Sequence, residues 1–292
     1  RDAGWIQLFA ETNQQAVDVH IQAFTVAEAL SMPVMVCVDG FILTHAYERM
    51  DVPDQEQVDR FLPSFEPRQV LDPADPISIG AMVGPEAFTE VRYIEHYKQI
   101  QALEIIPEIT KEFKEIFGRD SGGLISTYRV EDADTLILTL GSVIGTISEV
   151  IDEMRDKGHN IGALTIRSFR PFPLDEIHEV LKKTQRVVVF EKCLAVGLGG
   201  IVASNVRMAH RGLTTPVYTV IGGLGGRPIT RKSLNELFEK AMTDDLEETT
   251  FLDLKQDVVN HEIDRWEKFT HTGAIAENVL RQIGVVDVAK TT

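Results

Sequence analysis

Apolar residues divide the first part of the chain into a strand, a helix and a second strand. Residues 5–10 form the first apolar run. Apolar side chains then recur at helical spacing over residues 13–30, behind Thr12, a residue type that suits a helix N-cap. Residues 33–38 are almost wholly apolar, which predicts a strand buried on both faces. This order predicts a βαβ unit with parallel strands and a right-handed connection.

Prolines interrupt the pattern after this unit. They occur at six positions: Pro53, Pro63, Pro67, Pro73, Pro76 and Pro85. Because proline fixes φ and lacks an amide hydrogen, the segment predicts an extended connection with at most a short helix at 54–61. A long helical pattern follows over residues 86–117, with an expected interruption at Pro107 and an end at Gly118. A helix of this length suits packing between domains or subunits.

Strands and helices alternate regularly from residue 134 onward. The predicted strands are 135–140, 161–166, 186–190 and 217–221, and the predicted helices are 142–157, 174–184, 201–210 and 233–242. Such alternation predicts a doubly wound, mainly parallel sheet. We therefore expect an α/β protein with two α/β domains. The acidic residues after position 243 predict a solvated tail with a helix near 253–268.

Composition excludes several classes of function. The 292 residues are 43% hydrophobic, enough for two domain cores. A formal net charge of −16 argues against a nucleic-acid partner. No apolar run approaches the ~20 residues that cross a bilayer, and no signal-peptide pattern opens the chain, so we expect a cytoplasmic protein without a membrane partner. The first residue is not Met and a strand begins almost at once, so we expect upstream sequence to be missing.

The two cysteines, Cys37 and Cys193, form no metal-binding motif. The sequence has no C-x-x-C spacing, and no histidine stands near either thiol at ligand spacing. We therefore expect no metal site and no iron–sulfur cluster on this chain. Both side chains are predicted to be small core residues.

Polar residues follow the apolar run at 33–38. Asp39 and Gly40 end the predicted strand, and Thr44 and His45 come close behind. In open parallel sheets, ligands and partners collect at the carboxyl ends of strands. Two interpretations stay open: a binding loop, or an ordinary turn formed by Asp39 and Gly40.

Glycine-rich loops follow three later strands. Gly141 and Ser142 could present helix amides to an anion, but backbone fit and a helix cap by Ser142 explain them without any ligand and are favoured. The loops at 197–200 and 222–227 lack the spacing of phosphate-binding fingerprints, so they are either interface elements or turns.

A segment rich in arginine, proline and phenylalanine, R-S-F-R-P-F-P, occupies residues 167–173. Its second arginine, Arg170, could pair with Glu191 at the end of the next strand. A structural ion pair is the simplest interpretation.

These stretches occur in an order that resembles one family. They are G-W-I-Q at 4–7, N-Q-Q-A at 13–16, D-G-F with T-H at 39–45, L-G-S at 140–142, the segment at 167–173, E-K at 191–192 and the glycine loop at 222–227. The set resembles the alpha subunit of thiamine-diphosphate-dependent 2-oxoacid:acceptor oxidoreductases, which include pyruvate:ferredoxin oxidoreductase and phenylglyoxylate dehydrogenase. The resemblance extends to about residue 242.

The resemblance implies a division into four parts. Residues 1–52 would be the C-terminal part of a thiamine-enzyme pyrimidine-type domain, incomplete at its N-terminus. Residues 53–130 would be the Pro-rich connection and long helix. Residues 131–242 would form a transketolase C-terminal-like domain, and residues 243–292 a polar helical tail.

The activity implied by the resemblance is oxidative decarboxylation of a 2-oxoacid, such as pyruvate or phenylglyoxylate, with coenzyme A to acyl-CoA and CO₂. Thiamine diphosphate with Mg²⁺ would be shared with a diphosphate-binding beta subunit. Iron–sulfur clusters would lie only on partners, which include gamma and ferredoxin-like delta subunits. These partners would also determine whether ferredoxin or NAD accepts the electrons.

The family's catalytic residues correspond to positions upstream of this chain, so no catalytic residue is expected here. By resemblance, Asp39, Thr44 and His45 would lie near the interface with the diphosphate-binding subunit. Arg227 would belong to a similar interface element in the second domain.

Two other classes remain open. One is the beta-type subunit of a 2-oxoacid dehydrogenase or a transketolase-like enzyme, which shares the tandem α/β plan. The other is a non-catalytic scaffold or nucleotide-binding protein. Iron–sulfur absorbance and electron transfer in the purified complex would favour the oxidoreductase.

Overall fold

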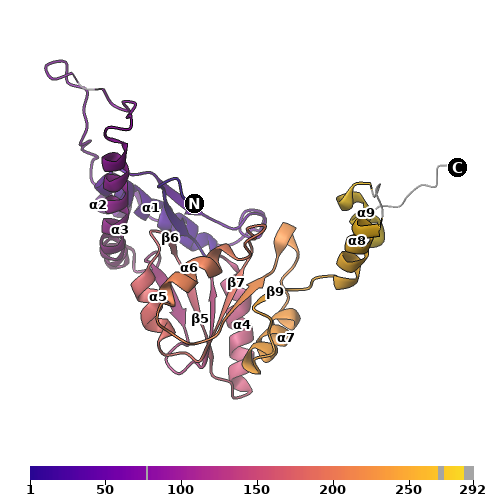
Figure 1. The fold of residues 1–292 in the computed structure, drawn as a ribbon. Helices are drawn as coiled ribbons and strands as arrows, with labels where there is room; N and C mark the ends of the chain where they lie inside the picture. Colours follow the sequence, from indigo (N-terminus) through magenta and orange to yellow (C-terminus); the bar gives the residue numbers. More distant parts are fainter. Residues whose placement is uncertain (77, 269–272, 286–292) are drawn as a thin grey trace. The chain divides into compact units, whose positions relative to one another are not determined.

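The computed structural model describes residues 1–76, 78–268 and 273–285. The chain forms two compact units, Arg1–Thr250 and Phe251–Thr292. The larger unit holds two sheets, which pack against different sets of helices (Figure 1).

The first sheet combines the predicted βαβ unit with a distant strand. β1 (Ile6–Phe9) and β2 (Val34–Cys37) are parallel and are joined by α1 (Asn13–Leu30). β6 (Ser168–Arg170) pairs with the other side of β1 in antiparallel orientation, so the strand order is β2-β1-β6. The Thr12 cap is confirmed, because its hydroxyl accepts the amide hydrogen of the third residue of α1.

The prediction that β2 is buried on both faces is wrong. The strand lies at the edge of the sheet and its residues are only partly buried, with Met35 41% exposed. An apolar run alone does not distinguish an edge strand from a central one. The exposed edge leaves β2 able to pair with further chain.

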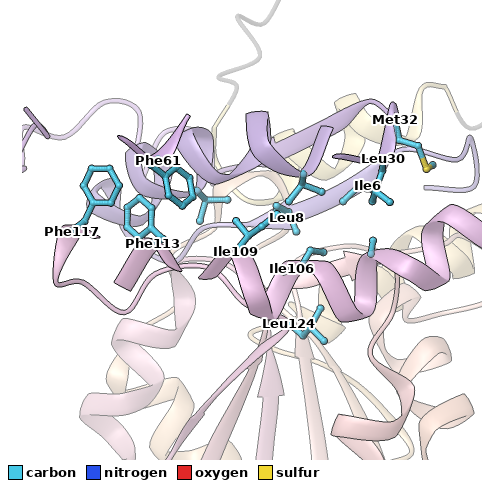
Figure 2. Packing of buried hydrophobic residues seen from close by; sticks show 13 residues of the cluster. Ile6, Leu8, Leu30, Met32, Phe61, Ile106, Ile109, Phe113, Phe117 and Leu124 are labelled. Atoms are coloured by element: carbon cyan, nitrogen blue, oxygen red, sulfur yellow. The ribbon is translucent and has the colours of Figure 1, made fainter. Parts of the chain in front are cut away.

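Two helices cover the first sheet together with α1. α2 (Gln55–Phe61) and α3 (Phe88–Phe117) pack on each other, and α3 also packs on α1. Figure 2 shows Phe61, Phe113 and Phe117 gathered at one end of this core. The ring of Phe61 lies edge-on to that of Phe113, with 5.4 Å between centroids.

The helix α3 continues through Pro107, so the expected interruption is absent. Ile106 and Ile109, on either side of the proline, are buried against α1 and the first sheet. Burial of such side chains contributes about 1.5–3 kcal/mol each, which offsets the hydrogen bond that proline removes. The helix ends at Gly118, which adopts the left-handed conformation with φ of 70°.

The second sheet has six strands in the order β3-β5-β4-β7-β8-β9. The strands are β3 (Ile125–Tyr128), β4 (Thr135–Thr139), β5 (Ile161–Ile166), β7 (Arg186–Glu191), β8 (Val217–Ile221) and β9 (Thr249–Phe251). Its helices are α4 (Val143–Asp156), α5 (Leu174–Leu181), α6 (Ile201–Ala209) and α7 (Arg231–Met242), with a short 3₁₀ turn η1 (Leu224–Gly226). The central strands β5, β4, β7 and β8 are parallel.

Helices cover both faces of this sheet, as a doubly wound fold requires. α5 and α6 pack together on one face, and α4 and α7 pack together on the other (Figure 1). The α/β class with mainly parallel sheets is therefore confirmed. The finer division at residues 52, 130 and 242 stays a prediction.

The smaller unit contains α8 (Gln256–Lys268) and α9 (Ile275–Gln282), which pack on each other. The side-chain amide of Gln282 donates to the carboxylate of Glu262 at 2.6 Å. Across the described parts of both units, no helix combines the length and apolar character needed to span a membrane.

Candidate functional site

The second sheet has a topological switch point between β4 and β7. The chain passes from β4 to β5 on one side and then crosses to β7 on the other. In open α/β sheets, ligands bind beside the carboxyl ends of the strands at this point. Here Gly141 and Ser142 follow β4, and Glu191 ends β7 with Lys192 directly behind it.

The carboxylate of Asp39 occupies this switch point. One oxygen accepts the backbone N–H of Ser142 at 2.5 Å, and the other lies 2.6 Å from the ammonium of Lys192. A Cβ at Gly141 would be 2.8 Å from the same carboxylate. Asp39 is thus an internal anion at the N-terminus of α4, where the helix dipole favours negative charge.

This contact corrects the prediction that Ser142 caps α4. The Ser142 side chain makes no cap hydrogen bond, and Asp39 accepts from the Ser142 amide instead. Burial raises the pKa of Asp39, but the hydrogen bonds from Lys192 and Ser142 outweigh that effect and hold the pKa below its ordinary value of 3.8. The carboxylate is therefore charged at neutral pH.

Glu191 accepts hydrogen bonds from the N-terminus of α6, as Asp39 does from that of α4. Its carboxylate is 2% exposed and accepts the amide hydrogens of Val202 at 2.8 Å and Ala203 at 3.1 Å. The predicted pair between Arg170 and Glu191 is wrong. Arg170 lies over the Phe169 ring and 3.6 Å from Asp2, because β6 leaves the second sheet and carries Arg170 to the first.

Both cysteines are partly buried thiols. Cys193 donates to Glu191 at 3.0 Å. Burial and this carboxylate raise the pKa of Cys193 to about 12, and burial raises the pKa of Cys37. Throughout the described ranges, no three His, Cys, Asp or Glu residues come together as a metal site.

The loop after Asp39 folds on itself. The hydroxyl of Thr44 accepts the backbone N–H of Phe41 at 2.8 Å and lies 2.9 Å from Nδ1 of His45. The Phe41 and His45 rings stack with 5.1 Å between centroids. Thr44 and His45 therefore order the loop, while Asp39 fixes it to the second sheet.

The two glycine loops flank the same edge. A Cβ at Gly200 would lie 2.1 Å from the Glu191 carboxylate, and a Cβ at Gly223 would lie 2.9 Å from Ile229 and 3.4 Å from Lys192. These glycines permit close approach of side chains from this chain itself. Arg227 is exposed at the end of the loop after β8. The roles of Asp39, Thr44, His45 and Arg227 at an interface stay predictions.

The spaces beside Gly141, Gly200 and Gly223 at this edge therefore do not admit a diphosphate. The spaces beside Gly141, Gly200 and Gly223 are filled by Asp39, Glu191 and Ile229 respectively. A bound diphosphate would also meet the negative charge of Asp39. Instead, the Asp39 carboxylate connects the end of β2 to the ends of β4 and β7.

A separate cavity of about 450 Å³ lies beside the start of β1, α3 and the 167–173 segment. Arg92 pairs with Glu95 and Arg170 pairs with Asp2 in its wall. Asp2 also pairs with Arg1, so the wall holds three arginines, Arg1, Arg92 and Arg170, and two carboxylates.

The ion pair of Lys192 with Asp39 and the helix cap supplied by Asp39 were not predicted. A usable signal existed: Asp39, Ser142 and Lys192 each follow the end of a predicted parallel strand within two residues, and such ends collect at one edge of a sheet. The sequence did not indicate that the end of β2, in the first sheet, lies against the second sheet.

Two family models match the chain. The model described as pyruvate flavodoxin/ferredoxin oxidoreductase, thiamine diP-bdg, matches residues 1–112. The model described as pyruvate:ferredoxin oxidoreductase core domain II matches residues 133–234.

Similar curated proteins carry related names. Pyruvate synthase subunit PorA from Methanothermobacter thermautotrophicus is 39% identical over 259 residues, which cover 88% of this chain and 67% of that protein. Ketoisovalerate oxidoreductase subunit VorA from Pyrococcus horikoshii is 36% identical over 242 residues, covering 82% and 61% respectively.

A solved structure shares the fold. The 2-oxoglutarate:ferredoxin oxidoreductase from Magnetococcus marinus, solved with 2-oxoglutarate, coenzyme A and succinyl-CoA bound, aligns with a TM-score of 0.57 at 17% identity. The alignment covers 82% of this chain and 42% of that one.

Proposed function

Because the chain belongs to the 2-oxoacid:ferredoxin oxidoreductase family as an alpha subunit, we propose that it works within a complex that oxidises a 2-oxoacid with coenzyme A. The similarity to PorA, which extends across both sheets at 39% identity, carries this proposal. The oxidoreductase reading is favoured over a dehydrogenase beta-type subunit or a scaffold because both family models describe such oxidoreductases.

The proposed reaction converts a 2-oxoacid anion and coenzyme A thiol into acyl-CoA, CO₂, two electrons and one proton. The carbon–carbon bond to the carboxylate breaks and a thioester forms. Thiamine diphosphate supplies the carbanion chemistry when bound, and iron–sulfur clusters on partner subunits receive the electrons. Pyruvate is the first candidate substrate, because PorA relatives are named pyruvate synthase subunits. Branched or aryl 2-oxoacids such as phenylglyoxylate are alternatives.

We assign the diphosphate and its Mg²⁺ to a partner beta subunit. The spaces beside Gly141, Gly200 and Gly223 are filled by side chains of this chain, and the switch point is occupied by Asp39. We also propose that gamma and ferredoxin-like delta subunits are partners of this chain and that the complex is cytoplasmic. The contribution of this chain is then an ordered surface, formed by the loop with Thr44 and His45 and by the loop that ends in Arg227.

The proposal is tested on the native complex, purified without oxygen. A panel of 2-oxoacids with coenzyme A is assayed for reduction of a viologen dye and of NAD. Thiamine-dependent dye reduction with one or more 2-oxoacids is expected. A complex that contains this chain but lacks thiamine-dependent 2-oxoacid oxidation would contradict the proposal.

A variant tests the assigned surface. His45→Ala is expected to lower turnover of the complex more than the folding stability of the chain, because His45 is exposed and its ring contacts Phe41 and Thr44 of its own loop. His159→Ala, an exposed histidine after α4, is the matched control. Unchanged turnover of the His45 variant with intact assembly would remove His45 from the proposed interface.

A further inference from the structure

A cavity of about 450 Å³ lies between the residues that precede β1, one face of α3, and the helices α5 and α6. Five α3 residues in its wall are spaced at helical intervals and so share one face of that helix: Arg92, Glu95, His96, Gln99 and Ile100. Cavities of about 300–1,000 Å³ are typical of small-molecule sites. The size of this cavity therefore suits a small organic ligand.

Arg170 contributes to the wall a guanidinium that the chain neutralises only in part. One of its N–H groups donates to the carbonyl of Phe169 at 2.6 Å, and the guanidinium lies over the Phe169 ring. Its ion-pair partner, Asp2, is 3.6 Å away and forms closer contacts, at 2.9–3.1 Å, with Arg1. Burial lowers the pKa of Arg170, because the attraction of Asp2 does not outweigh the loss of water. A bound anion would supply a closer partner.

Gln99 has a buried acceptor atom without a partner. Its side-chain nitrogen donates to the carbonyl of Gly4 at 2.8 Å, and this bond determines which end of the amide is the oxygen. The oxygen, Oε1, is buried and has no hydrogen-bond partner in the described part of the chain. Because buried polar atoms are normally hydrogen-bonded, Oε1 requires an O–H or N–H donor from a bound molecule or from water.

Large apolar side chains form much of the remaining wall. Trp5 is 43% exposed, Ile100 is 48% exposed and Met208 is 61% exposed, and Phe172 and Leu174 line the same cavity. Covering these side chains with the apolar body of a ligand is favourable, and methionine adapts readily to the shape of a bound molecule. The cavity thus combines an apolar wall with a few polar groups, as small-molecule sites do.

The charges of the wall match an anion that carries a single charge. With histidine neutral, Arg1, Arg92 and Arg170 are offset by two carboxylates, which leaves one positive charge. The two carboxylates are those of Asp2 and Glu95. One ligand carboxylate balances the remaining charge, whereas a diphosphate would bring uncompensated negative charge into the cavity.

We propose that this cavity binds an organic monocarboxylate that has an apolar body and a hydroxyl or N–H donor. The carboxylate pairs with Arg170, the donor binds Oε1 of Gln99, and the apolar body packs against Trp5 and Phe172. These contacts require no keto group, so the ligand need not be a substrate of the proposed reaction. The inference therefore does not rest on the proposed function.

The first experiment compares three ligands by isothermal titration calorimetry, with the full chain alone and with the native complex. The probe is 4-hydroxyphenylacetate, for which a dissociation constant on the order of 0.1–1 mM is expected. 4-Hydroxyphenylacetamide lacks the charge and phenylacetate lacks the hydroxyl donor. Each should bind on the order of tenfold more weakly than the probe.

Three outcomes of this comparison would overturn the proposal. Absence of binding would show a cavity that holds only water. Equal affinity for the three ligands would show that neither the charge nor the donor is recognised. Binding to the full chain alone but not to the complex would show that the cavity is covered when the complex assembles.

Two variants assign the binding to the cavity. Arg170→Gln should weaken binding of 4-hydroxyphenylacetate on the order of tenfold and leave that of the amide unchanged. Gln99→Met keeps a side chain of similar length without the acceptor, so it should weaken binding of 4-hydroxyphenylacetate on the order of tenfold and leave that of phenylacetate unchanged. A merely structural change of the cavity would weaken all three ligands alike. Such equal losses, or unchanged binding in both variants, would overturn the proposal.

The matched control is an arginine that does not line the cavity. Arg231, the first residue of α7, pairs with Glu149 and Glu153. Arg231→Gln should bind 4-hydroxyphenylacetate as the unaltered chain does, and a loss equal to that of Arg170→Gln would overturn the proposal. If Arg170→Gln does not fold, the ligand series and Gln99→Met still decide. Failure of 2-oxoacid oxidation in the native complex would count against the proposed function alone.

Discussion

The carboxylate of Glu191 lies in the space that a side chain at position 200 would need. A Cβ on Gly200 would be 2.1 Å from Glu191 Oε1 and 2.7 Å from the Thr219 methyl group. The absence of a side chain at Gly200 thus allows Glu191 to reach the first amides of α6.

Gly200→Ala is expected to lower the free energy of unfolding by about 1–3 kcal/mol, the usual cost of overpacking. Gly145 in α4 is the control, because it is exposed and a Cβ there meets no atom within 4 Å. Gly145→Ala should be neutral or stabilise by about 0.5–1 kcal/mol. Chemical denaturation of both variants checks the difference. Equal stabilities of the two variants would show that Glu191 can move away from a side chain at position 200 without cost.

The Cys193 thiol is expected to resist alkylation in the native chain. Because its pKa is raised to about 12 from 9.0, its thiolate fraction at pH 8 is about a thousandfold lower than that of an unfolded cysteine. Alkylation followed by peptide mass spectrometry, with and without denaturant, measures the ratio. Replacing Glu191 by Gln should speed native alkylation, and comparable rates in native and denatured chain would contradict the assigned environment.

The stability that Asp39 contributes should disappear in acid. Its pKa in the folded chain lies below the ordinary 3.8. A carboxyl with a lowered folded pKa stabilises fully above its unfolded pKa and loses this contribution as pH falls through the folded value. The difference in unfolding free energy between the unaltered chain and Asp39→Asn should therefore be constant above about pH 5 and shrink below pH 3.8. Denaturation curves at pH 7, 5 and 3.5 test this. A difference in unfolding free energy that grows as the pH falls would contradict the lowered pKa of Asp39.

The aromatic cluster shown in Figure 2 should dominate the stability of the first sheet and its helices. Phe113 is fully buried and stacks on Phe117 with 4.2 Å between centroids. Phe113→Ala is expected to cost about 3–5 kcal/mol, whereas Phe65→Ala, at a 57% exposed position, should cost little. Thermal unfolding of both variants measures this. A loss below 1 kcal/mol at Phe113 would show that α2 and α3 pack loosely.

Local signals in the sequence were enough for most of the second sheet. β5, with six buried residues, has the predicted bounds, and α1 also matches at both ends because Thr12 caps it and its apolar spacing is regular. Three short strands, β3, β6 and β9, were not predicted. Each has three or four residues, and its pairing depends on a distant neighbour and not on its own pattern.

The candidate site was harder to predict than the fold. Asp39 and Ser142 were both identified at strand ends, yet 103 residues separate them along the chain. Each was given a local explanation, a turn and a cap, because local hydrogen bonds can be inferred from sequence and contacts between sheets cannot. The same reason explains the incorrect pairing of Arg170 with Glu191.

The position of β6 sets an order in which the chain can finish folding during synthesis. Leu8 of β1 pairs with Ser168, so 160 residues must be made before the first sheet can gain its third strand. At about 5–20 residues per second this takes about 8–32 s. During that interval β1 has an open edge, which is a site for pairing with other chains. The N-terminal sheet of the protein is therefore completed late, by a strand that is synthesised after β4 and β5 of the second sheet.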